Sequence, residues 1–111
     1  MTQIIDINDI NFNKMIIENS IETPVLLKFW GNWCQPCKRM EPILKNISSL
    51  YNQKIKIFSI NVENNQITTN KFSIRSIPSL LFFHNGKLVS KHSGFLSEDQ
   101  IKELITSNFS I

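Results

Sequence analysis

The sequence predicts an α/β fold in which one mixed β-sheet is covered by helices on both faces. Strand-like and helix-like apolar patterns alternate along most of the chain, which is typical of parallel strands joined by crossover helices. The run Val25–Trp30 is almost continuously apolar, as expected for a central strand buried on both sides. The segment His84–Lys87 contains Asn-Gly, a strong signal for a tight turn between antiparallel strands.

The N-terminal segment is predicted to form a strand followed by a helix. Ile4–Ile7 is a short apolar run and a strand candidate. A helix is then expected from Asn8 or Asp9 to Asn19, with one of the two polar residues at its start as the N-cap. The apolar residues that support this helix by their spacing are Ile10, Phe12, Met15, Ile16 and Ile17.

A second helix is predicted to begin at the motif Cys34-Gln35-Pro36-Cys37 and to run to about Tyr51. Pro36 suits the first turn, because its fixed backbone angle is helical and its missing donor is not needed there. Pro42 lies inside the helix and should kink it, because it removes one backbone donor and crowds the preceding turn. The apolar stripe of this helix consists of Met40, Ile43, Leu44, Ile47 and Leu50.

The second half of the chain is predicted as a strand, a short helix, a hairpin and a closing helix. The expected strands are Ile55–Val62, Ser79–Phe83 and Leu88–Ser93, and the expected helices are Gln66–Phe72 and one that begins at Ser97. Acidic residues in the first turn of the closing helix suit the positive end of its dipole. The resulting order is β-α-β-α-β-α-β-β-α, a parallel part followed by an antiparallel hairpin.

Length and composition favour one soluble globular domain over residues 1–111. The chain is 41% hydrophobic and 19% charged, unlike a disordered tail. The net charge is only +3 and the lysines are scattered, so we expect no nucleic-acid binding. Met1–Asp6 lacks the basic and long apolar parts of a secretory signal, and no stretch is apolar enough to span a bilayer. We therefore expect a cytoplasmic protein without a membrane anchor.

The two cysteines, Cys34 and Cys37, carry the strongest functional signal. A disulfide between them closes too small a loop to stabilise the fold appreciably, so the pair indicates reactivity or metal binding. At a helix start, Cys34 would be an exposed thiolate stabilised by free backbone donors and the helix dipole. Cys37, one turn inward, would be more buried. This asymmetry fits thiol–disulfide exchange, in which Cys34 attacks and Cys37 resolves the mixed disulfide.

Zinc binding is the main alternative for a Cys-x-x-Cys pair, because it is half of a common zinc site. Two further ligands are needed, and the only histidines are His84 and His92. Both lie on the predicted hairpin without metal-ligand spacing, so we expect no metal. An inactive, purely structural cysteine pair is a second alternative of similar weight.

The segment from Phe29 to Lys38, which reads FWGNWCQPCK, resembles the active-site signature of the thioredoxin family. Ile74–Ser79 resembles the loop that contains the family's cis proline. Asn85-Gly86, Gly94 and Pro42 also stand where the family has its hairpin turn, a groove glycine and a helix proline. The resemblance covers essentially the whole chain.

The resemblance implies a central sheet flanked by helices and a protein-disulfide reductase that acts as an electron carrier. It implies Cys34 as the attacking and Cys37 as the resolving cysteine, and a cis bond between Ile77 and Pro78. A groove for an extended substrate segment would be bordered by Trp33, Ile77, Pro78 and Gly94, and exposed backbone groups of Ile77 could pair with the substrate.

The resemblance also implies the partners. They are disulfide-containing protein substrates and a thioredoxin reductase that draws electrons from NADPH. The chain itself has no nucleotide-binding glycine motif, so NADPH would act only through the partner, and the protein would be a monomer.

Two residues depart from the family pattern. Gln35 stands where glycine is commonest, so it bears on the redox potential, although the retained Pro36 favours a reductase. Lys28 stands in the central strand where the family commonly has a buried aspartate, and Ser59 replaces that acid's lysine partner. Lys28 could extend to the surface, favour the Cys37 thiolate as a cation, or accept a proton as a neutral amine.

Two other functions compete with the reductase. A disulfide oxidase or isomerase would use the same cysteines in an oxidising compartment. A non-redox binding subunit would use only the groove. The absence of a signal segment counts against the first, and the presence of both cysteines counts against the second.

Overall fold

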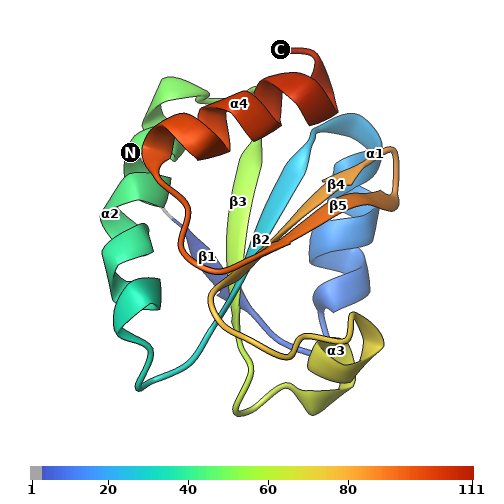
Figure 1. Cartoon of the computed structure of the whole chain (residues 1–111). Coiled ribbons are helices and arrows are strands. Elements are labelled where there is room, and N and C mark those ends of the chain that lie inside the picture. The colour runs from blue at the N-terminus through green and yellow to red at the C-terminus, as the bar shows by residue number, and fades with distance from the viewer. Residues whose placement is uncertain (1–3) are drawn as a thin grey trace.

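The computed structural model describes residues 4–111 and shows a five-stranded mixed sheet in the order β1-β3-β2-β4-β5. Strands β1, β3 and β2 are parallel, β4 is antiparallel to β2, and β5 is antiparallel to β4 (Figure 1). The predicted α/β fold is confirmed. The bounds are β1 Ile5–Ile7, β2 Val25–Trp30, β3 Lys56–Asn61, β4 Ser79–His84 and β5 Lys87–Ser93.

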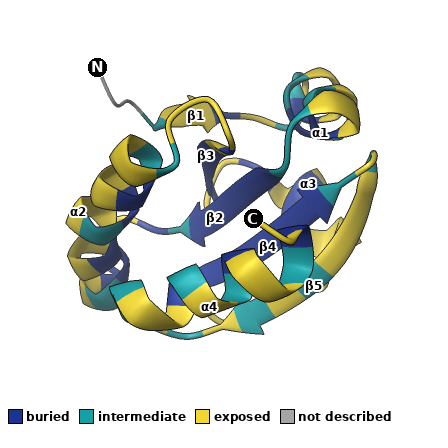
Figure 2. Ribbon diagram, turned by 90° about the horizontal axis from the view of Figure 1, so that it is seen from above, coloured by how far each residue is buried: buried dark blue, intermediate teal, exposed yellow. Residues whose placement is uncertain are grey.

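The helices cover both faces of this sheet. Figure 2 shows β2 and β4 as largely buried strands between them, with the outer strand β5 mostly exposed. Helices α2 and α4 pack on one face, and η1, α1 and α3 lie on the other (Figure 1). No helix within residues 4–111 is long and apolar enough to cross a membrane. The bounds are η1 Asn13–Glu18, α1 Asn19–Glu22, α2 Gln35–Leu50, α3 Gln66–Lys71 and α4 Glu98–Phe109.

Side-chain alternation in the central strand β2 determines which residues face α2. Leu27 and Phe29 belong to the apolar cluster on the η1 side of the sheet, whereas Leu26 belongs to the cluster beneath α2 and α4. Since successive side chains of a strand point to opposite faces, Lys28 shares the face of Leu26. The lysine therefore lies on the side of the sheet that carries the cysteine helix.

The first helical segment differs from its prediction. It runs from Asn13 to Glu22 instead of from Asn8 or Asp9 to Asn19, and its first part is a π-helix. The delay arises because Asn8 and Asn11 exchange side-chain-to-backbone hydrogen bonds of 2.8 and 2.9 Å, which form a turn. As a consequence Ile10, expected in the apolar stripe, is 94% exposed.

Asp9 also does not cap its own helix. Its carboxylate accepts hydrogen bonds from the backbone of Thr68 at 2.8 Å and of Ile67 at 3.2 Å, at the start of α3. Burial alone would raise the pKa of Asp9, but these hydrogen bonds outweigh it and hold that pKa below its ordinary value. Asp9 therefore ties the N-terminal loop to a helix far away in the sequence.

The other elements lie within one or two residues of their predicted bounds. Met1–Gln3, part of the stretch interpreted as lacking a secretory signal, lies outside the described residues. Asn85 and Gly86 form the hairpin turn with φ of 56° and 77°. Ser97 caps α4 in a reciprocal capping box with Gln100, as its position at the predicted helix start requires.

Candidate functional site

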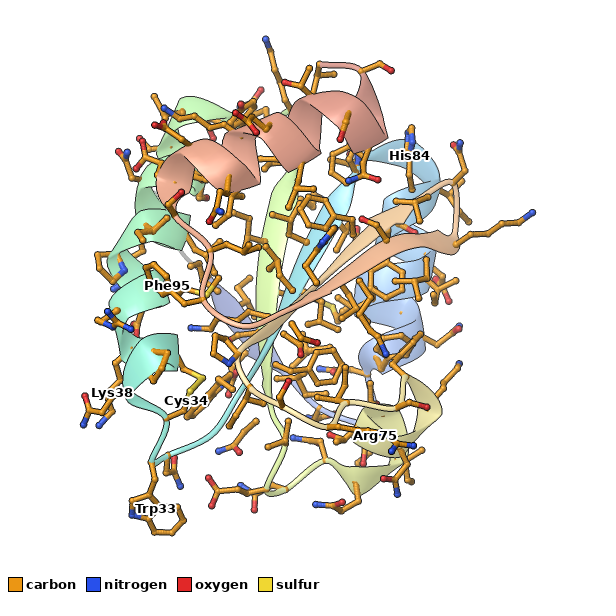
Figure 3. The ribbon with its side chains drawn as sticks, in the orientation of Figure 1. Trp33, Cys34, Lys38, Arg75, His84 and Phe95 are labelled. Carbon is orange, nitrogen blue, oxygen red and sulfur yellow. A yellow bond between two sulfur atoms is a disulfide. The ribbon has the colours of Figure 1, made fainter. Side chains whose placement is uncertain are left out.

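Cys34 and Cys37 lie at the N-terminus of α2, joined to each other by a disulfide. Cys34 is the N-cap residue with an extended backbone (φ −89°, ψ 99°), and Pro36 lies in the first turn of the helix. The backbone N–H of Cys34 donates to the carbonyl of Gly31 at 3.2 Å, which closes the turn leading from β2. Figure 3 shows Cys34 at this end of the helix.

The backbone of α2 stabilises negative charge on the Cys34 sulfur. Cys34 Sγ accepts a hydrogen bond of 3.1 Å from the backbone N–H of Cys37. This N–H is one of the orphan donors of the helix N-terminus, where the helix dipole is positive. Both influences favour a thiolate at Cys34 once the disulfide is reduced.

Burial distinguishes the two sulfurs less strongly than we expected. Cys34 is 8% exposed and Cys37 is 2% exposed, so Cys34 is not the openly exposed residue that its position predicted. It forms part of the wall of a groove instead. Cys37 is the more deeply buried of the two, as the sequence predicted.

The groove beside Cys34 has a volume of about 520 Å³ and is lined mainly by apolar groups. Trp33 and Ile77 both contribute to it. Trp33 is 84% exposed and projects away from the ribbon below Cys34 (Figure 3). The groove is lined by Gly31, Trp33, Cys34, Gln35, Pro36, Val62, Glu63 and Ile77.

The Ile77–Pro78 peptide bond is cis, as the family resemblance implied. Within residues 4–111 the backbone N–H and C=O of Ile77 make no hydrogen bond. Pro78 itself is buried and does not line the groove.

Gly94 lies next to Pro78 rather than in the groove. Its N–H donates to the carbonyl of Pro78 at 2.8 Å, and its φ is +95°. The following residue, Phe95, packs beneath the guanidinium of Arg39 from α2, with 4.7 Å between the guanidinium carbon and the ring centroid. This cation–π contact joins the loop after β5 to the cysteine helix, and no pattern in the sequence indicated it.

Glu63 is a second residue that sequence reasoning missed. Its carboxylate accepts a hydrogen bond of 2.6 Å from the backbone N–H of Asn32, two residues before Cys34. A Cβ added at Gly31 would approach the Cδ1 atom of Ile77 to 2.8 Å and Glu63 Oε1 to 3.4 Å. Glu63 therefore stabilises the turn that leads to Cys34, and Gly31 leaves room for Ile77.

A second cavity, of about 660 Å³, lies behind the cysteines and contains Lys28 in its wall. Cys37 lines it from α2, and Asp6 and Ser59 line it from β1 and β3. Lys28 is only 5% exposed as a residue, although its side-chain nitrogen is not fully buried. The interpretation in which its ammonium group extends to the surface stays a prediction. Gln35 is exposed at the first position of α2 and lines the groove beside Cys34. Lys28 lines the other cavity, together with Cys37.

The histidines lie away from this site. His84, at the end of β4, is at the opposite end of the sheet from Cys34 (Figure 3). His92 lies on β5, and burial lowers its pKa. Within residues 4–111 no three residues among histidine, cysteine, aspartate and glutamate are grouped as a metal site would require.

Comparison with known proteins agrees with this geometry. The profile of the family described as Thioredoxin matches residues 3–107. Thioredoxin of Haemophilus influenzae is 37% identical over 108 residues, which cover 97% of this chain and 99% of the relative. Thioredoxin of Buchnera aphidicola subsp. Schizaphis graminum is 40% identical over 108 residues, with 97% and 98% covered. Thioredoxin C-2 of Corynebacterium nephridii is 36% identical over 105 residues, with 95% of each chain covered.

Proposed function

The chain belongs to the thioredoxin family and is a thiol–disulfide oxidoreductase, a protein-disulfide reductase, and we propose that Cys34 attacks the substrate and that Cys37 resolves the intermediate. The observation that carries this assignment is the position of Cys34 as the N-cap of α2, with its sulfur hydrogen-bonded to the N–H of Cys37. A thiolate is the nucleophile in disulfide exchange, and a helix N-terminus favours it. Cys34 lines the substrate groove, whereas Cys37 does not.

The proposed reaction has two exchange steps. The Cys34 thiolate attacks one sulfur of a substrate disulfide, forming a mixed disulfide and releasing the other substrate sulfur as a thiolate. Cys37 then loses its proton and attacks the Cys34 sulfur, which forms the Cys34–Cys37 disulfide and releases the second substrate thiolate. Two electrons pass to the substrate, and its two thiolates take protons from solvent.

Substrate binding is proposed to use the groove beside Cys34. The unpaired backbone groups of Ile77 suit the main chain of an extended segment, which pairs with them as a strand pairs with a sheet edge. Trp33 and Ile77 offer apolar surface to side chains that flank the substrate disulfide. We propose that Pro78 and Gly94 act indirectly, by holding this loop beside Cys34 through their mutual hydrogen bond.

Reduction of the Cys34–Cys37 disulfide is assigned to a partner thioredoxin reductase that draws electrons from NADPH. We further propose that the protein is a single-domain monomer over residues 1–111 and that it works in the cytoplasm. This location suits a reductase, because the protein must return to its dithiol form after each turnover and a reducing compartment favours that form. No observation in residues 4–111 favours the disulfide oxidase, the isomerase or the non-redox binding subunit.

Insulin reduction with NADPH and a thioredoxin reductase tests the proposal. The wild-type protein should support turnover, whereas Cys34→Ser should abolish it. Cys37→Ser should accumulate a mixed disulfide between Cys34 and substrate, detectable by mass. Accumulation in Cys34→Ser instead would reverse the two roles, and turnover without both cysteines would refute the mechanism. Equilibration with glutathione measures the potential and hence the effect of Gln35.

A further inference from the structure

A row of polar residues crosses three strands of the sheet behind the cysteines. In the register of the parallel strands, Asp6 of β1 pairs with Ser59 of β3, and Ser59 pairs with Lys28 of β2. Since neighbouring strands are about 4.8 Å apart, the three backbones are close together. The Ser59 hydroxyl donates to Asp6 Oδ1 at 2.6 Å, and the indole N–H of Trp30 donates to the same oxygen at 3.0 Å.

Lys28 has no comparable partner. Within residues 4–111 its side chain makes neither a hydrogen bond nor an ion pair of 4.0 Å or less, although it is only 5% exposed. It lines the same cavity as Cys37, which lies in the first turn of α2. Its side-chain nitrogen is not among fully buried polar atoms without a partner, since no such atom occurs within residues 4–111. Placing a largely desolvated ammonium in a cavity that Cys37 also lines is still costly.

The surroundings of Lys28 act on its charge in two opposing ways. Burial lowers the pKa of its ammonium below the ordinary value, while the carboxylates of Glu41 and Asp6 oppose that shift and Lys45 adds to it. Two carboxylates in the same cavity therefore compensate part of the desolvation. These carboxylates favour the protonated form of Lys28 without forming a direct ion pair with it.

We propose that Lys28, as a cation, is a positioning residue that stabilises the Cys37 thiolate during resolution of the mixed disulfide. This inference rests on the proposed function, because it assigns the resolving step to Cys37. The Cys37 thiol loses its proton to solvent, its sulfur bonds to the Cys34 sulfur, and the bond between Cys34 and the substrate breaks. Negative charge develops on Cys37 Sγ before that attack, and a nearby cation lowers its free energy.

Solvent can receive the proton because the cavity is open at one side. Glu41 and Lys45, one ion pair along α2 at 3.5 Å, have side chains that are more than half exposed. They lie at the rim, whereas Lys28 lies in the floor. No general base has to touch Cys37 in this scheme.

Lys28 is the buried charge among those that face the cavity. Asp6 comes from β1, Lys28 from β2, and Lys38, Glu41 and Lys45 from α2, while β3 contributes only the neutral Ser59. Lys38 and Lys45 are exposed, so water and salt screen their effect on a buried sulfur. Asp6 and Glu41 would oppose a thiolate, which leaves Lys28 as the buried group that favours it.

Titration of Cys37 in a Cys34→Ser background tests the inference directly. Ultraviolet absorbance of the thiolate reports its charge without requiring a reagent to reach the sulfur. We expect Lys28→Met and Lys28→Gln each to raise the apparent Cys37 pKa by about one unit, a tenfold loss of thiolate below that pKa. Lys28→Arg should retain the wild-type value because it retains the cation. Lys45→Met is the matched control and should shift the pKa far less than Lys28→Met.

A kinetic measurement gives a second readout with both cysteines present. Substrate release from a preformed mixed disulfide should be about tenfold slower in Lys28→Met at neutral pH, and the difference should shrink at alkaline pH, where Cys37 ionises unaided and Lys28 loses its charge. A structural defect alone would slow release at every pH.

The inference is overturned if Lys28→Met and Lys28→Gln leave the Cys37 pKa unchanged or lower it. It is also overturned if Lys28→Arg raises that pKa as Lys28→Met does, since packing rather than charge would then be responsible, or if Lys45→Met gives an equal shift. Failure of the proposed function is separate, because it appears as absent insulin reduction by the wild-type protein.

Discussion

Replacement of Lys28 by methionine should stabilise the oxidised protein at neutral pH. The two side chains are similar in length, but methionine carries no charge to desolvate. Lys28 is 5% exposed on the central strand β2, and its face of the sheet is otherwise packed by residues such as Leu26. In the native protein burial lowers the pKa of Lys28, opposed by Glu41 and Asp6. A lowered lysine pKa in the folded state means that folding is weakened wherever the unfolded chain is protonated.

The expected gain follows from the loss of this desolvation penalty. Replacing buried ions by well-packed apolar residues commonly stabilises a protein by about 1–4 kcal/mol. The lower part of that range, about 1–2 kcal/mol, is expected because Asp6 and Glu41 lose an attractive charge. Each keeps other partners, Ser59 and Trp30 for Asp6 and Lys45 for Glu41. For a chain of this length, about 1 kcal/mol corresponds to about 4 °C in Tm.

The gain should depend on pH in one direction. Between the lowered pKa of Lys28 in the folded state and its unfolded value of about 10.4, the unfolded chain binds more protons. The stability of the wild-type protein therefore receives a rising contribution from Lys28 as pH increases through this window, and it is penalised below it. Methionine has no such dependence, so its advantage is largest at neutral pH and shrinks toward about pH 10.

Urea unfolding of the oxidised proteins measures this difference, with the free energy of unfolding obtained by linear extrapolation. The measurement is made at neutral pH and near pH 10. Lys87→Met is the control, because Lys87 is exposed on β5 and its replacement should change stability by less than about 0.5 kcal/mol at both pH values. If Lys28→Met is less stable than the wild type at neutral pH, or if its advantage is the same at both pH values, the account of a desolvated lysine is wrong.

Three further predictions concern local structure, each measured by urea unfolding. Asp9→Ala should destabilise the protein by about 1 kcal/mol, because α3 loses the acceptor for two of its first amides. Folding lowers the pKa of Asp9. The loss of stability in Asp9→Ala should therefore be full above about pH 4 and vanish as pH falls through the folded pKa of Asp9. Ser97→Ala should cost about 1 kcal/mol through loss of the capping box of α4, and Ser97→Asp should restore most of it. Gly86→Ala should cost about 1 kcal/mol because its φ is +77°, and a cost near zero would show that the turn changes its conformation.

Much of the fold was predictable because its signals are local. The apolar run of β2 and the Asn-Gly turn each specify their own element. The first helix was misplaced because a non-local contact decided it. Asp9 is a good helix cap by residue type, yet it binds the backbone of α3, and no local pattern reveals that.

Sequence alone determined the cysteine pair, the order of strands and helices, and the unusual lysine in the central strand. Only the tertiary structure decided what surrounds that lysine. Register across three strands places Asp6 and Ser59 beside Lys28. The alternation of side chains along β2 puts Lys28 on the face that carries Cys37 rather than on the face covered by η1. The physical reason is that the field at a buried sulfur depends on which charges share its cavity, and these charges come from segments far apart along the chain.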